Sequence, residues 1–94
     1  MTENMIKFWT RKKVVRRKDM NAIETIGDAV KQIRESKGME RMEVADKGIM
    51  SVFTLRNIEL GVQYPTLKTL SRIANGLDVK ISDIVIKMER LNNG

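Results

Sequence analysis

The stretch VADKGIMSVFTLRNIELG, residues 44–61, constrains the fold more than any other part of this chain. A short segment with an apolar face ends at Ala45, and another begins at Ser51, a residue type that commonly caps helices. Leu55 and Ile58 follow one turn apart, so both side chains can anchor the second segment to a core. The stretch therefore predicts two short helices joined by a tight turn.

Apolar residues recur at spacings of three and four across residues 21–91, which predicts helices. The first helix opens at a capping box, formed either by Asn21 and Glu24 or by Thr25 and Asp28, and it ends at Gly38. Further helices are expected over residues 40–47, over residues 52–60, after a cap at Thr66 and after a cap at Ser82. The inward positions are expected to be Ile23, Ile26, Val30, Ile33, Met39, Val44, Ala45, Leu55, Ile58, Leu67, Leu70, Ile73, Ala74, Leu77, Ile84, Val85, Met88 and Leu91. The predicted fold is all-α, a compact five-helix bundle.

Composition excludes several classes of function. The 94 residues suffice for one domain and include neither Cys nor His, so the commonest general base, the commonest metal ligand and thiolate nucleophiles are missing. We expect no enzyme, no cofactor and no metal site. No apolar run approaches the roughly 20 residues that span a bilayer, and residues 1–8 lack the apolar core of a signal peptide. A cytoplasmic protein without a membrane span is the expectation.

Nearly all of the net charge lies at the N-terminus. Residues 1–20 hold seven basic and two acidic groups, a surplus of five out of a total of +6. The basic cluster is Arg11, Lys12, Lys13, Arg16, Arg17 and Lys18. We expect residues 1–20 to be a flexible or loosely ordered arm, residues 21–91 to be the folded domain and residues 92–94 to be a tail. Such segregation favours a polyanionic partner, either nucleic acid or an acidic membrane surface; a solubilising tail is the plainer alternative.

A set of residues shared with one known family runs through the predicted bundle: Ile26, Gly27, Ile33, Arg34, Gly38, Val44, Ala45, Ser51, Leu55, Ile58, Glu59, Gly61, Pro65, Leu67, Leu70, Ile73 and Ala74. In this set, from Ile26 to about Val85, the chain resembles the Cro/Xre-type, phage-repressor-like helix-turn-helix DNA-binding domains. No single residue of this set identifies the family, but the whole combination, which aligns without a gap, does. The resemblance implies a lambda-repressor-like bundle.

The resemblance also implies an ion pair between Arg34 and Glu59. Each of these residues is flanked by inward apolar residues, so neither side chain is expected to be fully solvated. A pair of this kind fixes the orientation of two helices more than it adds stability. Two unrelated surface charges are the alternative.

The resemblance assigns DNA contacts to the helix from Ser51 to Leu60. The residues implied to face the bases are Val52, Phe53, Thr54, Arg56 and Asn57. Those implied to face phosphate are Arg41, Ser51, Gln63 and Tyr64. Because Val52 and Phe53 cannot form hydrogen bonds with a base, thymine methyl groups are their natural contacts, and an exposed apolar patch for a protein partner is the alternative.

The chain departs from the family pattern at three places. The family glycine of the turn falls at Ile49, while this chain has its glycine at Gly48, so either the turn differs or Gly48 takes it and the loop lengthens. The polar pair that opens the second helix is replaced by Glu40 and Arg41. Asp78 stands where glycine usually ends the fourth helix, so that helix is expected to end early, near Gly76.

The functional hypothesis is a sequence-selective regulator of transcription, a repressor that binds double-stranded DNA as a homodimer. The helix Ser51–Leu60 would enter the major groove, the arm would follow the phosphates or enter the minor groove, and apolar side chains of the last helix, such as Ile86, would form the dimer contact. The alternative is a protein-interaction module that binds another regulator through Val52 and Phe53, with the arm on nucleic acid or an anionic surface.

Overall fold

The structure, a computed structural model, describes residues 25–93 as five helices. They are α1 (Ile26–Ser36), α2 (Arg41–Gly48), α3 (Val52–Glu59), α4 (Leu67–Leu77) and α5 (Ile81–Asn93). The all-α bundle predicted from the sequence is confirmed for this part of the chain. The basic arm, Ile23 and the Asn21–Glu24 capping alternative lie outside the described residues.

Side-chain caps begin three of the helices. Thr25 and Asp28 form the capping box of α1: the Asp28 amide donates to Thr25 Oγ1 at 3.3 Å and the Thr25 amide donates to Asp28 Oδ2 at 2.8 Å. Ser51 and Thr66 accept amide hydrogen bonds at the starts of α3 and α4. These three caps agree with the sequence.

The predicted cap of α5 is wrong. Ser82 lies inside the helix, because the Asp83 carboxylate accepts from the Lys80 amide at 2.9 Å and the helix begins one residue earlier, at Ile81. At its other end α5 continues through Asn92 and Asn93, which the sequence analysis assigned to a tail.

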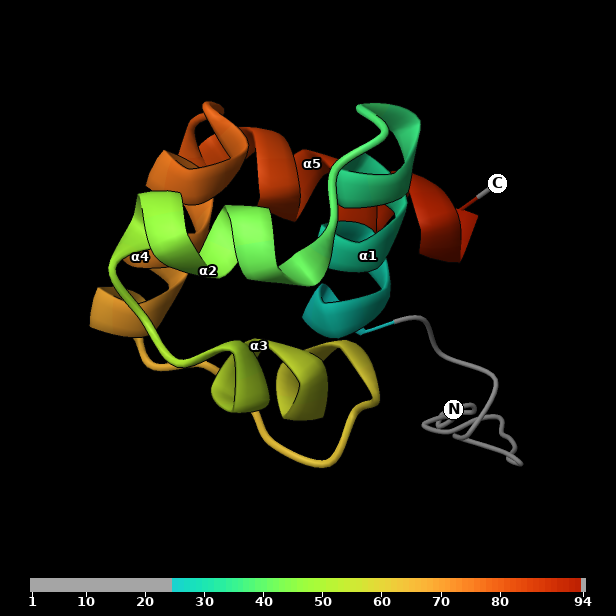
Figure 1. Cartoon of the computed structure of the whole chain (residues 1–94). Coiled ribbons are helices and arrows are strands. Elements are labelled where there is room, and N and C mark those ends of the chain that lie inside the picture. The colour runs from blue at the N-terminus through green and yellow to red at the C-terminus, as the bar shows by residue number, and fades with distance from the viewer. Residues whose placement is uncertain (1–24, 94) are drawn as a thin grey trace.

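The helices enclose one core, and α3 lies along its lower edge in Figure 1, with α1 and α2 above it and the connection to α4 running below it. The largest fully buried side chains are those of Leu55, Ile58, Ile73, Leu77, Ile84, Val30 and Val44. Leu67 was expected inside, yet its side chain is 71% exposed at the first position of α4. Lys68 is exposed as well, and the buried stripe of α4 starts only at Leu70.

Helices α2 and α4 pack backbone to backbone at two glycines. A Cβ on Gly48 would overlap the carbonyl oxygen of Arg72, and a Cβ on Gly76 would overlap the carbonyl oxygen of Val44. Gly76 therefore serves this close approach and does not end α4, which continues to Leu77. Asp78 then takes the left-handed conformation, with φ of 60°.

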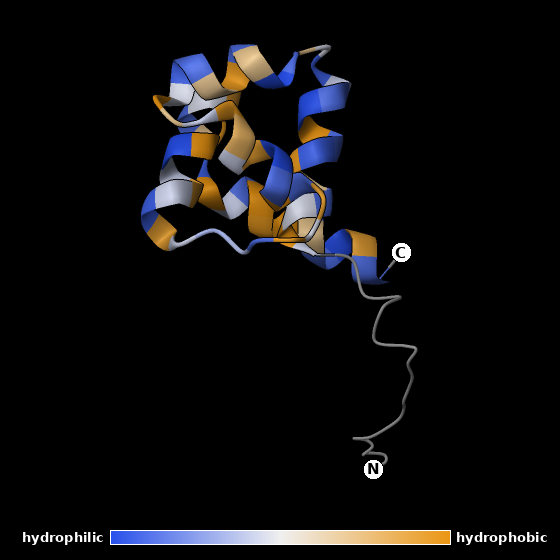
Figure 2. Ribbon diagram, turned by 60° about the horizontal axis from the view of Figure 1, so that its bottom comes forward, coloured by the Kyte–Doolittle hydropathy of each residue, from blue (hydrophilic) through white to orange (hydrophobic). Residues whose placement is uncertain are grey.

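Figure 2 shows that every helix carries both hydrophobic and hydrophilic segments, as a bundle with a single core requires. Within residues 25–93, no helix combines the length and the apolar character needed to cross a bilayer.

Candidate functional site

A buried carboxylate fixes α3 to the two helices that precede it. The Glu59 side chain is fully buried, and its two oxygens accept three hydrogen bonds. Arg34 in α1 donates from Nε to Oε2 at 2.8 Å and from Nη2 to Oε1 at 3.0 Å, and Arg41 in α2 donates from Nε to Oε1 at 2.9 Å. Arg34 also donates to the Met39 carbonyl at 2.8 Å. The pair that the resemblance implied is thus present, and it belongs to a triad.

The charge and the planar shape of the Arg34 and Glu59 groups hold the triad in one geometry. The hydrogen bond to Glu59 raises the pKa of Arg34 above its usual value, although burial opposes this shift, so the guanidinium stays charged. The two-pronged contact matches the planar guanidinium to the planar carboxylate and leaves little freedom in the angle between α1 and α3.

The resemblance implies that Arg41 faces phosphate, and in the structure Arg41 contacts the Glu59 carboxylate. Its side chain is 32% exposed, and Nε is engaged by Glu59. In the family this position lies at the start of α2. In this chain Arg41 stands there, and its side chain turns toward the buried carboxylate of Glu59 in α3. A phosphate contact from Arg41 would have to come from the rest of its guanidinium group.

Ile49, and not Gly48, makes the turn between α2 and α3. Ile49 adopts the left-handed conformation, with φ of 56°, and Gly48 remains helical. The Met50 amide donates to the Ala45 carbonyl at 3.0 Å, and Arg72 Nη1 donates to the Ile49 carbonyl at 2.6 Å. Sequence reasoning missed Arg72 because the contact joins residues 23 positions apart.

α3 separates the expected base-facing residues into two groups. Leu55 and Ile58 anchor the helix in the core, and Val52 is half-buried against the same core. Phe53 is 64% exposed and Arg56 is also exposed. Thr54 and Asn57 are half-buried. The outer flank of α3 therefore presents Phe53, Arg56 and Asn57, while Val52 mostly serves packing.

Two of these side chains have unused hydrogen-bonding capacity. Among the residues that the structure describes, none forms a hydrogen bond or an ion pair with the side chain of Arg56 or of Asn57. Gln63 and Tyr64 are exposed in the connection between α3 and α4, and Tyr64 is 71% exposed. Ser51 is exposed as well, with its hydroxyl oxygen already accepting from the Phe53 and Thr54 amides. These groups line the start and the end of α3.

Charge is segregated inside the folded part of the chain. Residues 47–77 run from the last two residues of α2 through α3 and its two connections to the end of α4, and they contain four basic residues and one carboxylate. That carboxylate is Glu59, which is buried between two arginines. The solvated surface of this segment is therefore basic only. This surplus is hidden when the charge beyond the arm is summed as a whole, because the acidic groups of α1, α2 and α5 cancel it.

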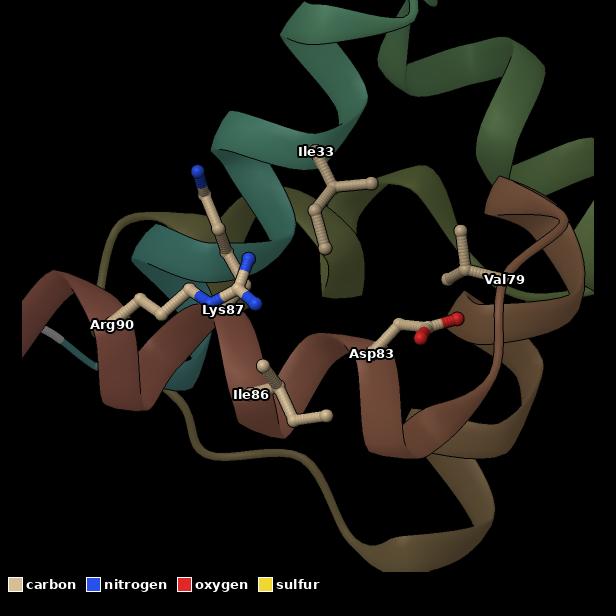
Figure 3. Close-up of a pocket in the computed structure, with 6 residues that line it drawn as sticks. All are labelled: Ile33, Val79, Asp83, Ile86, Lys87 and Arg90. Atoms are coloured by element: carbon tan, nitrogen blue, oxygen red, sulfur yellow. The ribbon is translucent and has the colours of Figure 1, made fainter.

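A separate hollow of about 290 Å³ lies between α1 and α5. Figure 3 shows that Asp83, Ile86, Lys87 and Arg90 line it from α5, with Ile33 opposite on α1. Ile86, expected at a dimer contact, is 44% exposed there. Within residues 25–93 no group of carboxylates is arranged to hold a metal ion.

One family profile and one phage protein match the sequence of this chain. The profile of the helix-turn-helix family matches residues 30–84. An immunity repressor protein of Bacillus phage phi105 is 33% identical over 61 residues, which is 65% of this chain and 42% of that protein. The chain thus spans less than half the length of this relative.

Solved structures share the fold. The restriction-modification controller protein C.Esp1396I superposes with a TM-score of 0.70 at 23% identity, covering 78% of this chain and 96% of that chain. The clp gene regulator ClgR from Corynebacterium glutamicum gives 0.66 at 23% identity, covering 73% and 90%. The controller protein C.AhdI from Aeromonas hydrophila gives 0.61 at 17% identity, covering 68% and 96%.

Proposed function

This chain belongs to the helix-turn-helix family of the Cro/Xre type, and we propose that it represses transcription by binding a selected double-stranded DNA sequence through α3. In this proposal α3 enters the major groove, where its outer flank contacts base edges. The observation that carries the proposal is the flank itself: no residue that the structure describes forms a hydrogen bond with the side chain of Arg56 or Asn57, and the only carboxylate of residues 47–77 is buried.

The chemistry of the exposed side chains divides them between bases and backbone. An Asn side chain pairs with adenine and an Arg side chain with guanine, each through two hydrogen bonds in the major groove. Gln63, Tyr64 and Ser51, together with the amino-terminal end of α3, suit phosphate oxygens, which position the protein without selecting sequence. Arg41 is a weaker phosphate ligand, since Glu59 engages it.

The basic arm supplies further phosphate contacts in this proposal. Each neutralised phosphate adds about −0.9 to the slope of log K against log salt concentration. We expect deletion of residues 1–18, which carry all seven basic groups of the arm, to flatten that slope. An unchanged slope would mean that the arm does not contact DNA.

A homodimer fits the small size of the domain, because one domain contacts few base pairs and two domains contact two half-sites about 34 Å apart. We place the dimer contact on α5, where Ile86 is exposed beside Lys87 and Arg90. Ile86→Asp should shift the protein toward monomer in sedimentation equilibrium and weaken binding to paired half-sites. Repression in particular is supported by the immunity repressor of phage phi105, which this chain matches over part of its length.

Selection of bound duplexes from a random pool tests the proposed function directly. We expect enrichment of a two-fold symmetric sequence, bound by two copies of the chain. Uniform binding that salt abolishes would contradict the proposal and favour an interaction module whose arm binds any polyanion.

Asn57→Ala supplies the matching test at one residue. It should weaken the selected duplex by roughly 1–3 kcal/mol and leave binding to unrelated duplexes unchanged. An equal loss on both duplexes would show that Asn57 contacts no base.

A further inference from the structure

One arginine of α4 reaches the turn from which α3 begins. Arg72 Nη1 donates to the Ile49 carbonyl at 2.6 Å, although the two residues lie 23 positions apart in the sequence. Hydrogen bonds from charged donors are stronger than those between neutral groups. The two segments meet because α2 and α4 pack backbone to backbone there: a Cβ on Gly48, the residue before Ile49, would overlap the carbonyl oxygen of Arg72 itself. The contact therefore ties the turn to the body of the bundle.

The turn depends on such a contact because little else holds the conformation of Ile49. Its φ of 56° is unfavourable for a β-branched residue. Its side chain is 76% exposed, so apolar packing contributes little. Its amide donates only a long hydrogen bond, of 3.3 Å, to the Asp46 carbonyl. A residue in an unfavourable conformation persists only where its surroundings hold it, and at this turn Arg72 supplies the side-chain restraint.

The two ends of α3 are fixed in different ways. The fully buried Leu55 and the buried Glu59 attach the middle and the C-terminal end of the helix to the core. The N-terminal end follows directly from the turn, since the capping residue Ser51 is exposed and Val52 is only half-buried. A change in the turn would therefore shift the N-terminal end of α3 while the core contacts persist.

We infer that Arg72 is a positioning residue for the proposed DNA contact: by holding the Ile49 carbonyl, it fixes the direction in which α3 enters the groove. This inference rests on the proposed function and adds to it a residue of α4 that acts without touching DNA. Without the restraint from Arg72, the turn samples other conformations, and only a fraction of the molecules presents α3 correctly. The apparent Kd rises in inverse proportion to that fraction.

Variants at position 72 test the inference through the Kd for the duplex selected from the random pool. Arg72→Met keeps an apolar stem and removes the donor, and we expect it to raise the Kd about tenfold, which corresponds to about 1.4 kcal/mol. Arg72→Lys keeps a charged donor and should recover most of the affinity. Lys68→Met is the matched control, because it removes the same charge from an exposed position one turn earlier on α4. It should change the Kd by less than about twofold.

A change at Ile49 shows whether Arg72 acts through the turn. Glycine adopts positive φ at no steric cost, so the Ile49→Gly turn needs less support. In the Ile49→Gly background, Arg72→Met should raise the Kd about threefold at most. The salt dependence of binding gives a second readout. An arginine that acts through the turn leaves the slope of log K against log salt concentration unchanged, whereas loss of a direct phosphate contact reduces its magnitude by about 0.9.

The outcomes separate the inference from the proposed function. Thermal unfolding gives the melting temperature of each variant, and binding is measured well below it; Arg72→Gln repeats the test if Arg72→Met does not fold. If the folded variant binds like Lys68→Met, Arg72 serves stability alone, and the inference is overturned while the proposed function stands. An equally large loss in the Ile49→Gly background, or a reduced salt slope, assigns Arg72 to the DNA itself and also overturns it. If no duplex is enriched, the proposed function fails and the inference fails with it.

Discussion

The triad of Glu59, Arg34 and Arg41 predicts that its two arginines contribute very differently to stability. Arg34 is 11% exposed and donates twice to Glu59, so Arg34→Met strands a fully buried carboxylate that keeps only one partner. Breaking a buried pair in this way costs roughly 3–5 kcal/mol. A domain of about 70 residues has roughly 3–10 kcal/mol in total, so this variant should be largely unfolded in modest urea.

Arg41→Met should be far milder. Arg41 is 32% exposed and makes one hydrogen bond to Glu59, which retains both bonds from Arg34 after the change. We expect a loss of about 1 kcal/mol. The free energy of unfolding is measured for each variant by urea titration, followed by circular dichroism of the helices.

The double variant Arg34→Met/Glu59→Met decides whether the cost comes from the stranded charge. Removal of both members of the pair leaves Arg41 with access to water, so the double variant should be more stable than Arg34→Met alone. Equal costs for the two single arginine variants, or additive losses in the double variant, would refute the reasoning.

Three further changes test the geometry around α3. Ile49→Gly should raise the free energy of unfolding by about 0.5–1 kcal/mol, because it relieves left-handed strain in a β-branched residue and loses little burial. Asp78→Gly is the matched control at the other left-handed residue and should raise the free energy of unfolding by less. A lower free energy of unfolding in Ile49→Gly would contradict the argument. Gly76→Ala should destabilise the fold and lower its melting temperature, since the new Cβ overlaps the Val44 carbonyl; unchanged melting would show that α2 and α4 can separate. Arg41→Gln should change the salt slope of DNA binding by less than about 0.9 if Glu59 holds Arg41 in the complex, and a full loss of about 0.9 would assign Arg41 to a phosphate.

Local signals in the sequence determined the helices and most of their ends. The caps at Thr25, Ser51 and Thr66 use side-chain oxygens that reach an amide two or three residues away, so nothing distant is needed to form them. Gly38 ends α1 with φ of 67° for the same reason, since its conformation depends on its own backbone. Apolar periodicity likewise located the core of α3 at Leu55 and Ile58.

The sequence was less reliable wherever two local signals competed. Ser82 and Asp83 can both serve the start of α5, and the carboxylate prevails by accepting from the Lys80 amide. Leu67 continues the apolar stripe of α4, but its side chain is 71% exposed, so the stripe is solvated in the first turn of the helix. Apolar periodicity indicates which residues share one face of a helix. It does not indicate how much of that face the neighbouring helices cover.

Only the tertiary structure decided how α3 is presented. The left-handed turn at Ile49 is held by Arg72 from α4, and Arg41 turns toward Glu59 because α1 and α3 bring a buried carboxylate within its reach. The basic character of residues 47–77 became visible only once Glu59 proved to be buried. Each of these features joins segments far apart in the chain, and a contact of that kind depends on packing that no local pattern records.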